Sequence, residues 1–600
     1  MCGIVGIVSQ YNSIPNVLKG LKSLEYRGYD SAGIGFISNN KVKEVKCVGK
    51  IINLKNILKN KYKSNIIIGH TRWATHGKPS KRNAHPFTKE NCTLVHNGII
   101  ENYELLLKKY KINKSKLESD TDSEIIAEIF NKLYKKKIKT HEILNQLIKD
   151  IKGTFAIAII ISNENRIYAF KKSSPLLIGV GKNEISISSD ILGLPNTCKD
   201  IIYLEDNDII DIMPNSYNII NQKKIQKRKI HKFISSYQNT NKGSYKHFML
   251  KEIYEQPLSI KNSLINFSTN KFKKINLPKT KIQFNKISNI HLTGCGTAFN
   301  ACMIAKYWFE ELTNIQTSVD ISSEYRYRKC TLNKHSLGIV VSQSGETMDT
   351  LESLKKYLFK KINTASIVNV LGSSISRKSD YVLPTISGSE IGVAATKTFT
   401  SQLLVLALFA LHIGKENKKF NNLLFESLFK LPDQIKETLK LQKNIKKIIP
   451  ALKKSKSIFY IGRGTMYPLA LEGALKLKEI TYKHCEGYAS GELKHGPLAL
   501  IEKNIPVIAL APYNEHFDKL ISNIEEIKAR DAEIIILTDK KGANKIKNKI
   551  KKVIIMPNTN FLTAPIIYSI PIQLIAYNLA DYLGKEIDQP RNLAKSVTVE

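Results

Sequence analysis

The sequence has no hydrophobic run long enough to cross a membrane. Its longest apolar run, Leu403 to Ile413, is shorter than the about 18 apolar residues that a spanning helix requires. The stretch Met1 to Gly6 also lacks the basic segment and the small-residue cleavage site of a secretory signal. These absences predict a soluble protein that stays in the cytoplasm.

Closely spaced cysteines are absent as well. The cysteines are far apart and none of them forms a CxxC motif; they stand at positions 2, 47, 92, 198, 295, 302, 330 and 485. Zinc sites and disulfide frameworks both need regular, close cysteine spacing. We therefore expect reduced thiols and no metal ion, and nothing else in the sequence requires a cofactor.

Acidic residues are few for the number of basic ones. The chain has 52 Asp and Glu against 92 Lys and Arg, which gives a formal net charge of +40. Such a basic excess is typical of proteins that bind nucleic acid. The basic residues are mostly Lys dispersed with Ile and Asn, as in Lys545 to Lys552, and an A+T-rich genome would produce this pattern without any binding role. Arg and aromatic residues form no cluster on one segment. We expect no nucleic-acid partner; binding with a steep salt dependence would indicate one.

A chain of 600 residues is too long for a single hydrophobic core, so several domains are expected. Over residues 1–220, β-rich runs such as Phe155 to Ile161 alternate with amphipathic stretches such as Ile125 to Tyr134, which predicts a layered α+β domain. The segment 221–246 is polar and basic with few apolar residues, and we interpret it as a linker.

The remainder contains a weak internal repeat. The motif Gly-Cys-Gly-Thr at 294–297 and the motif Gly-Arg-Gly-Thr at 462–465 each follow an apolar strand and lead into an Ala- and Leu-rich helical stretch. The next turns after a strand, at Ser342 and Ala511, follow at nearly equal intervals. The repeat predicts two copies of one α/β unit, with parallel sheets covered by helices on both faces. Only the first copy has hydroxyls in its second turn, so we expect the copies to differ in function.

Cys2 is the first candidate catalytic residue. Removal of Met1 would leave its thiol beside a free α-amino group, whose pKa of about 7.7 to 8.0 lets it act as a base near neutrality. The alternative is a small buried residue at the start of a strand.

Three more segments of this half carry polar groups next to predicted strands or helices. In the run Gly69 to Gly77, Arg72 could hold an α-carboxylate through paired hydrogen bonds. Asn97-Gly98 is either a hairpin turn or an oxyanion hole formed by the Asn amide and the Gly N–H. Asp122 precedes an amphipathic helix and is either its N-cap or the anion that receives a substrate ammonium.

Together these motifs resemble the glutaminase domain of the N-terminal-nucleophile amidotransferases. The matching segments are Cys2 to Gly6, Tyr26 to Gly33, His70 to His76, His96 to Gly98 and Ser119 to Asp122. The resemblance implies an αββα layered fold in which Cys2 attacks the glutamine amide while Asn97 and Gly98 hold the oxyanion. It implies that glutamine is bound by Arg72, Thr75, His76 and Asp122.

In the second half, the segment Ser342 to Thr347 lies between a strand and a helix, and it is either a phosphate site or a plain Ser/Thr-rich cap. Lys476 and Glu479 lie three apart on one face of a predicted helix, which alone favours a surface ion pair. His495 stands in a turn-rich segment, where a lone histidine is more often structural. Composition does not distinguish Lys595 from the other lysines.

The repeated unit resembles a pair of sugar isomerase domains, and the chain from Cys2 to Glu600 resembles the glutamine:fructose-6-phosphate aminotransferase (isomerising) family. Further matching segments are Lys251 to Pro257, Ser342 to Thr347, Glu390 to Ala394, Leu475 to Ile480, Gly491 to Pro497 and Asp588 to Glu600. The implied architecture is α/β overall, with a glutaminase domain at 1–220, a linker at 221–246, parallel-sheet sugar isomerase domains at 247–430 and 431–587, and an active-site tail at 588–600. The length leaves little room for the insertion of eukaryotic members, which predicts a bacterial type.

The resemblance also implies the reaction. The amide nitrogen of L-glutamine passes as channelled ammonia to D-fructose 6-phosphate, giving D-glucosamine 6-phosphate and L-glutamate, the first step of amino-sugar synthesis. His495 of a neighbouring subunit opens the sugar ring, which implies a homodimer, and Lys595 forms a Schiff base with the C2 ketone. Glu479 moves a proton between C1 and C2, and Lys476 stabilises developing negative charge.

Further residues follow from the same resemblance. Trp73 gates the ammonia channel, and the sugar phosphate is bound by Thr297, Ser342, Gln343, Ser344, Thr347 and Val393. Ala298 and Ala395 stand where relatives often have serine, and each loses a hydrogen bond worth about 0.5 to 1.5 kcal/mol. A different class of function, a regulator that binds sugar phosphate without catalysis, is disfavoured because the catalytic residues are intact.

Overall fold

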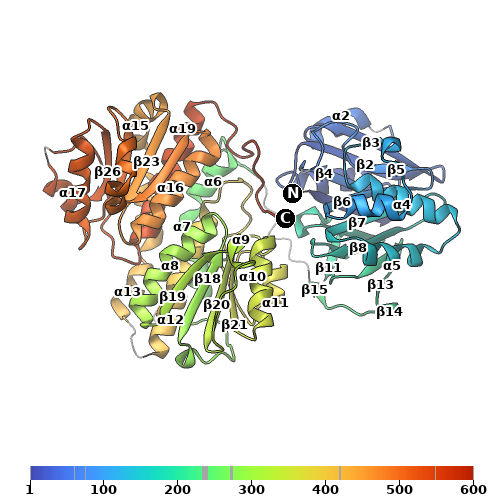
Figure 1. Cartoon of the computed structure of the whole chain (residues 1–600), viewed down its shortest axis with the longest axis horizontal. Coiled ribbons are helices and arrows are strands. Elements are labelled where there is room, and N and C mark those ends of the chain that lie inside the picture. The colour runs from blue at the N-terminus through green and yellow to red at the C-terminus, as the bar shows by residue number, and fades with distance from the viewer. Residues whose placement is uncertain are drawn as a thin grey trace. The chain divides into compact units, whose positions relative to one another are not determined.

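The computed structural model describes residues 2–59, 61–74, 76–232, 241–269, 274–417, 421–547 and 549–598 (Figure 1). The chain divides into two compact units, Met1–Thr240 with Ala594–Glu600, and Asn241–Leu593. The first unit holds the predicted glutaminase half and the end of the predicted tail. The second unit holds both predicted sugar isomerase domains.

The first unit is built on antiparallel sheets. One sheet has the strand order β15-β11-β9-β10-β1-β4-β2-β3 and the other the order β14-β13-β12-β8-β7-β6-β5. The strands of the first sheet are β1 (Gly3–Ser9), β2 (Ser31–Ser38), β3 (Lys41–Val48), β4 (Ile66–Arg72), β9 (Leu177–Gly181), β10 (Glu184–Ser188), β11 (Cys198–Tyr203) and β15 (Ile230–Lys232). Those of the second are β5 (Phe87–Lys89), β6 (Cys92–Ile100), β7 (Gly153–Ile161), β8 (Ile167–Lys172), β12 (Ile209–Met213), β13 (Ser216–Asn221) and β14 (Lys224–Ile225).

Helices cover the outer face of each sheet. The helices α1 (Ile14–Ser23) and α2 (Ile51–Leu58) share an apolar cluster with the first sheet. The helices α3 (Tyr103–Lys109), α4 (Ser123–Lys135) and α5 (Thr140–Asp150) do the same on the second sheet. A separate apolar cluster, which includes Ile4, Ile68 and Ile160, fills the space between the sheets. The predicted αββα layering is confirmed.

The segment predicted as a linker, 221–246, contains two short strands. β14 pairs with β13, and β15 pairs with β11, so the sheets of the first unit extend to Lys232. Composition hid these strands because they lie at the edges of their sheets, where their side chains are mostly exposed and polar residues cost little. Residues 233–240 of the predicted linker lie outside the described residues.

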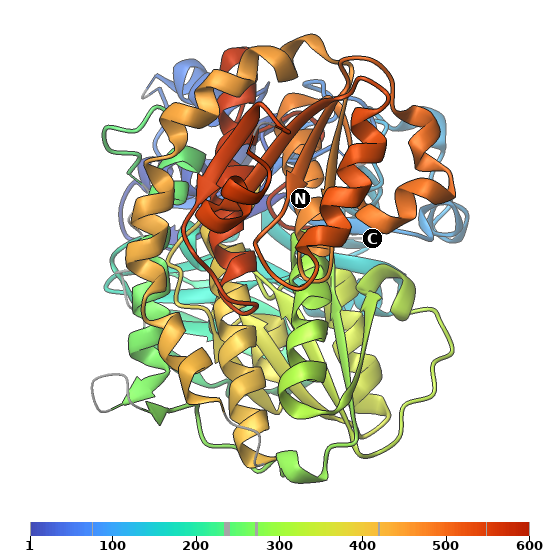
Figure 2. The ribbon, with the colours of Figure 1, turned by 90° about the vertical axis from the view of Figure 1, so that its left-hand side faces the viewer.

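The second unit contains two parallel sheets of the same topology among its described residues. Their strand orders are β19-β18-β20-β21-β22 and β24-β23-β25-β26-β27. The first copy consists of β18 (Asn289–Gly294), β19 (Gln316–Ile321), β20 (Ser336–Ser342), β21 (Asn363–Val368) and β22 (Tyr381–Pro384). The second consists of β23 (Ser457–Gly462), β24 (His484–Ala489), β25 (Pro506–Leu510), β26 (Glu533–Asp539) and β27 (Lys552–Met556). The predicted duplication is confirmed, and Figure 2 shows the second copy above the first.

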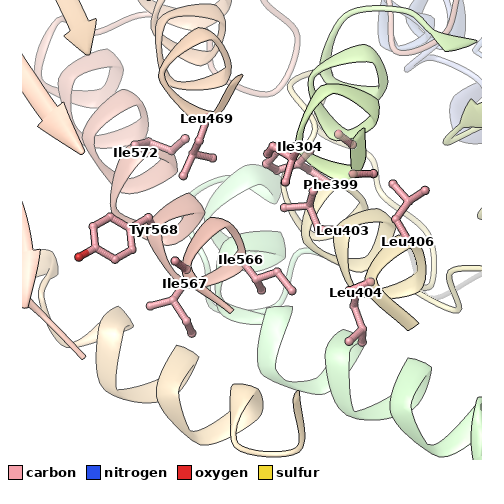
Figure 3. Close-up of a cluster of buried hydrophobic side chains, with 14 of the residues drawn as sticks. Ile304, Phe399, Leu403, Leu404, Leu406, Leu469, Ile566, Ile567, Tyr568 and Ile572 are labelled. Atoms are coloured by element: carbon pink, nitrogen blue, oxygen red, sulfur yellow. The ribbon is translucent and has the colours of Figure 1, made fainter. Parts of the chain in front are cut away.

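The copies share one hydrophobic core. It is formed by one face of each sheet together with α8 (Thr297–Thr313) and α12 (Lys397–Glu416) of the first copy and α15 (Gln442–Lys454), α16 (Met466–Thr481) and α19 (Ala564–Tyr582). Figure 3 shows Ile304 and Leu403 on the side of the first copy, and Leu469 and Ile572 on the side of the second. The opposite faces are covered by α10 (Met348–Phe359) and α11 (Ser374–Lys378), and by α17 (Phe517–Lys528) and α18 (Lys540–Lys545).

Further helices complete the second unit: α6 (Phe248–Tyr254), α7 (Gln256–Asn266), α9 (Ser322–Tyr325), α13 (Asn422–Leu428) and α14 (Leu431–Leu439). The helix α12 is long and apolar enough to cross a membrane by length and composition, and it includes the longest apolar run of the sequence. Its side chains are buried along nearly its whole length, as in the core helix of a soluble protein.

Substitution of Leu403 by Ala should destabilise the second unit by about 2 to 5 kcal/mol, because it opens a cavity in the shared core. The control is Leu423→Ala in α13, where the side chain is 77% exposed and the change should stay within about 0.5 kcal/mol. Urea unfolding of both variants measures the difference. Equal midpoints would show that α12 does not anchor the core.

Candidate active site

Strand pairing places Cys2 at the end of β4. Gly3 lies opposite Thr71 in the β1–β4 ladder, so the residue before β1 meets the residues after β4. The Trp73 N–H donates to the Cys2 Sγ at 3.3 Å, and Sγ lies 3.5 Å from the Trp73 carbonyl oxygen. The Trp73 ring packs edge-on against Tyr29, with the ring centroids 5.7 Å apart. The contact with the thiol is therefore made by the backbone of Trp73.

The Cys2 thiol is protonated at neutral pH in this environment. Burial raises the pKa of Cys2, while the Trp73 N–H and the Arg72 guanidinium act in the opposite direction. A thiol with a raised pKa needs a base to become a nucleophile. Cys2 can therefore act as a nucleophile in this site only if a base next to it removes the thiol proton.

Asn97 and Gly98 lie inside β6 and pair with β7, so the alternative of a hairpin turn is wrong. The Asn97 Nδ2 donates to the carbonyl oxygen of Cys2 at 3.1 Å, which places the amide beside the candidate nucleophile. Gly98 has φ +141°, and a Cβ there would meet the Thr154 carbonyl oxygen at 1.9 Å. Only glycine fits at this position, because the two strands approach each other too closely for a side chain.

The guanidinium of Arg72 organises the turn after β4. Its Nη2 donates to the carbonyl oxygens of His76 and, at 3.2 Å, of Gly77. Its Nη1 is buried and has no hydrogen-bond partner within the described ranges, which leaves a donor for a ligand such as a carboxylate. His76 is exposed, and Thr75 lies outside the described residues.

Asp122 precedes α4 but makes no side-chain cap of that helix, so the capping alternative is wrong. Its Oδ2 accepts the backbone N–H of Ile100 at 2.8 Å, which ties the loop before α4 to the end of β6. Burial lowers the pKa of Arg72, and the charges of Cys2, Asp30 and Asp122 oppose that effect. These groups thus lie within electrostatic reach of one another, as the predicted glutamine site requires.

In the second unit, the sheet topology makes one end of each sheet a candidate ligand site. β18 lies between β19 and β20, and β23 between β24 and β25. Where the chain order reverses in this way, a crevice opens outside the carboxyl ends of the strands. The segments 294–297 and 342–347 both lie at this point of the first copy.

The segment Ser342 to Thr347 forms a hydroxyl-rich loop before α10. Ser342 Oγ lies 3.0 Å from Thr347 Oγ1 and accepts the Gly345 N–H at 3.0 Å, and Ser344 Oγ accepts the Glu346 N–H at 3.1 Å. Thr347 is the N-cap of α10 by position, yet its side chain makes no cap hydrogen bond. The plain-cap alternative is therefore wrong, and the hydroxyls bond within the loop.

Lys476 and Glu479 are not a surface ion pair. The Lys476 side chain is fully buried, and its Nζ lies 2.6 Å from Glu479 Oε2 and 3.4 Å from Glu472 Oε1. Glu472 accepts hydrogen bonds from Thr297 Oγ1 at 3.0 Å and from Asn300 Nδ2 at 2.8 Å. The sugar isomerase copies therefore meet in one buried polar cluster, between α8 and α16.

Burial and charge set the protonation of this cluster. Burial raises the pKa of Glu472, which the Lys476 ammonium opposes and the Glu479 carboxylate reinforces. Burial would lower the pKa of Lys476, but the carboxylates of Glu479 and Glu472 outweigh it and raise that pKa. These carboxylates therefore favour the charged form of Lys476.

A carboxylate of the segment 251–257 binds backbone N–H groups of the segment 390–394. Glu252 accepts the N–H groups of Ile391 at 2.5 Å and Gly392 at 3.2 Å, and so holds the loop that carries Val393. The Val393 N–H in turn donates to the carbonyl oxygen of Asp588 at 3.0 Å. The start of the predicted tail is thereby fixed within the second unit.

Two further predicted residues, His495 and Lys595, belong to other segments. His495 is exposed at the end of a short 3₁₀ helix, Ser490–His495. Lys595 belongs to the first unit, whereas Lys476 and Glu479 belong to the second. That Lys595 shares a site with Lys476 and Glu479 stays a prediction.

Comparisons with known proteins agree with the predicted fold class. The SIS domain family matches residues 283–412 and 451–580, and the glutamine amidotransferase domain family matches residues 70–195. Relatives named glutamine--fructose-6-phosphate aminotransferase [isomerizing] cover this chain and their own over the whole length. The relative from Bartonella henselae is 43% identical over 615 residues, and that from Acinetobacter baylyi is 42% identical over 613. The chain belongs to this aminotransferase family.

A solved structure agrees with the assignment of the second unit. It is the C-terminal domain of glucosamine-fructose-6-phosphate aminotransferase from Francisella tularensis, 41% identical, with a TM-score of 0.57. The match covers 59% of this chain and all of that one.

Sequence analysis missed residues that contact the predicted site residues or their neighbours. Asp30 accepts the Ala74 N–H at 2.8 Å and fixes the turn behind Trp73. Glu472 completes the cluster around Lys476. The helical spacing of Glu472, Lys476 and Glu479 was the available signal for it, since residues four and three apart share a face.

Substitution of Gly98 by Ala should lower glutamine hydrolysis at least about tenfold and destabilise the first unit by at least about 2 kcal/mol, because β6 and β7 must separate. Gly584→Ala is the control: its φ is also positive, at +61°, but no atom lies within 4 Å of the added Cβ. Hydrolysis rates and urea midpoints of both variants test this. Normal hydrolysis by Gly98→Ala would remove Gly98 from the site.

Proposed function

We propose that this chain transfers the amide nitrogen of L-glutamine to D-fructose 6-phosphate and isomerises the product to D-glucosamine 6-phosphate. The observation that carries the proposal is the full-length match to relatives named for this reaction, in a chain that keeps the candidate residues of both sites. Incubation with glutamine and fructose 6-phosphate, followed by assay for glucosamine 6-phosphate, tests it directly.

In the glutamine half, Cys2 attacks the amide carbon. Since burial keeps the thiol protonated, the base is the α-amino group that removal of Met1 leaves on Cys2. The Asn97 amide and the Gly98 N–H stabilise the oxyanion, because the amide already lies beside Cys2. Arg72, with Thr75 and His76, binds the α-carboxylate side of glutamine, and Asp122 receives the α-ammonium.

In the sugar half, the phosphate binds the loop of Ser342, Gln343, Ser344 and Thr347, with Thr297 and Val393 beside it. Backbone N–H groups and hydroxyls at the start of a helix attract a dianion without a formal positive charge. His495 opens the ring, and Lys595 forms a Schiff base that ammonia replaces. Glu479 then moves the proton from C1 to C2, with Lys476 balancing the negative charge.

Assembly and location complete the proposal. Trp73 gates the passage of ammonia, so that the nitrogen reaches the sugar without loss to solvent. The chain acts as a cytoplasmic homodimer, because His495 serves the site of the neighbouring subunit. Its exposed position in the described structure agrees with such a role.

Substitution of Cys2 by Ala should abolish synthesis from glutamine, by at least about a thousandfold, because the nucleophile is lost. Binding of fructose 6-phosphate should not change, since the sugar residues lie in other domains. The control is Cys330→Ala, which removes another partly exposed thiol and should keep full activity. Glucosamine 6-phosphate formation by Cys2→Ala at a normal rate would overturn the assignment.

Borohydride reduction in the presence of fructose 6-phosphate should trap the sugar on Lys595, because a Schiff base is reducible and a salt bridge is not. Peptide mass spectrometry locates the adduct. Lys595→Arg should lose both the adduct and synthesis, whereas the control Lys585→Arg should keep both. An adduct on Lys476, or none in a fully active enzyme, would contradict the role of Lys595.

A further inference from the structure

Glu472 lies beside Lys476 and Glu479, but the proposed reaction assigns it no role. Glu472, Lys476 and Glu479 lie four and three residues apart on α16, which places them on one side of the helix. The Lys476 ammonium lies 3.4 Å from Glu472 and 2.6 Å from Glu479. One buried cation is shared by two carboxylates.

The carboxylates differ in their surroundings. The side chain of Glu472 is 1% exposed, and each of its oxygens accepts a hydrogen bond from α8 of the first copy, one from Thr297 and one from Asn300. The side chain of Glu479 is 20% exposed. Glu472 is therefore held in place by the first copy, and Glu479 is the carboxylate that a substrate can reach.

The role proposed for Glu479 requires its charge to change during the reaction. Glu479 takes the proton from C1, the C1–H electron pair forms a C1–C2 double bond, and the electrons of the protonated C2 imine move to nitrogen. An oxygen lone pair of the C1 hydroxyl then forms the carbonyl, the hydroxyl proton passes to the new C2 amino group, and C2 takes the proton back from Glu479. Between these steps Glu479 is neutral, and without Glu472 the buried Lys476 ammonium would have no anion in this cluster, which is strongly disfavoured.

Glu472 is suited to this intermediate state. Burial raises the pKa of Glu472, the Lys476 ammonium opposes this effect, and the Glu479 carboxylate adds to it. The repulsion between the carboxylates ends when Glu479 takes the proton, which favours the ionised form of Glu472 in the state in which Lys476 needs it.

We propose that Glu472 is a positioning residue, held by Thr297 and Asn300 of the first copy, that remains the counter-ion of Lys476 while Glu479 carries the substrate proton. The inference rests on the function proposed above for Glu479. It gives the first copy a part in the proton transfer, through α8.

The variant Glu472→Gln removes the charge but keeps the size and a carbonyl oxygen for Thr297. With glutamine and fructose 6-phosphate, kcat should fall at least about tenfold, while KM for the sugar should change by less than about twofold. The primary isotope effect with fructose 6-phosphate deuterated at C1 should rise, because proton transfer becomes more rate-limiting. The urea midpoint should not fall, because one of the two buried negative charges around a single cation is removed.

The matched control is Glu255→Gln, which removes the carboxylate 2.7 Å from another buried ammonium of the same unit, that of Lys397. Here we expect a lower urea midpoint and an unchanged isotope effect, as for a structural ion pair. If Glu472→Gln behaves like this control, or like the parent, the inference is overturned.

Glu479→Gln separates this inference from the proposed function, since it should abolish synthesis. If Glu479→Gln remains active, the role of Glu479 fails and the inference fails with it. If Glu479→Gln is inactive and Glu472→Gln shows the parent kcat and isotope effect, only the inference fails.

Discussion

The packing of α8 against α16 is the contact on which the sugar half of the molecule depends. It leaves the Lys476 ammonium without access to water, so the charge must be balanced by protein groups. The same contact joins Ile304 and Leu469 in the shared apolar core and carries Thr297 and Asn300 to Glu472. Neither copy alone could satisfy this cluster, so packing of the copies and assembly of the polar site occur together.

The glutamine half depends on strand register in a similar way. The β1–β4 ladder sets where Cys2 stands relative to Trp73, and the close approach of β6 to β7 sets the conformation at Gly98. Backbone groups make the contacts with the thiol, and side chains such as Asp30 and Arg72 hold that backbone in place. A change of one residue in register would turn the candidate residues to the other face of their sheet.

Periodicity and turn motifs predicted the elements of this fold well. The run Phe155 to Ile161 lies in β7, and the repeated glycine motifs lead into α8 and α16 as expected. Local sequence patterns gave wrong predictions where contacts with distant segments determine the structure. Asn97-Gly98 has the composition of a hairpin turn, but pairing with β7 makes it part of a strand.

The same limit explains the errors at the candidate sites. Helical spacing places Lys476 and Glu479 on one face, but it does not show that α8 covers that face, and so the pair looked exposed. Glu472 was missed for this reason. The Asp122 carboxylate binds the Ile100 N–H across the loop instead of capping its own helix, and no local pattern predicts that choice.

The two copies share a topology, yet the turns that begin at Ser342 and Ala511 have different charged neighbours. In the second copy, the Tyr513 N–H of the equivalent turn donates to Asp539 Oδ2 at 2.8 Å, and Oδ1 of the same carboxylate accepts the Lys541 N–H at 2.9 Å. The Asp539 carboxylate thus occupies the Tyr513 N–H of this turn and would repel a dianion there. In the first copy, the residue that follows the corresponding strand is the uncharged Asn369, whose N–H donates to the Gln343 carbonyl oxygen. The predicted phosphate loop therefore meets no carboxylate from this neighbouring strand, although its own Glu346 accepts the Ser374 N–H at 2.8 Å. The acid-for-amide difference between Asp539 and Asn369 thus adds to the hydroxyls that only the first turn carries, and both differences favour the first copy as the site of the predicted phosphate.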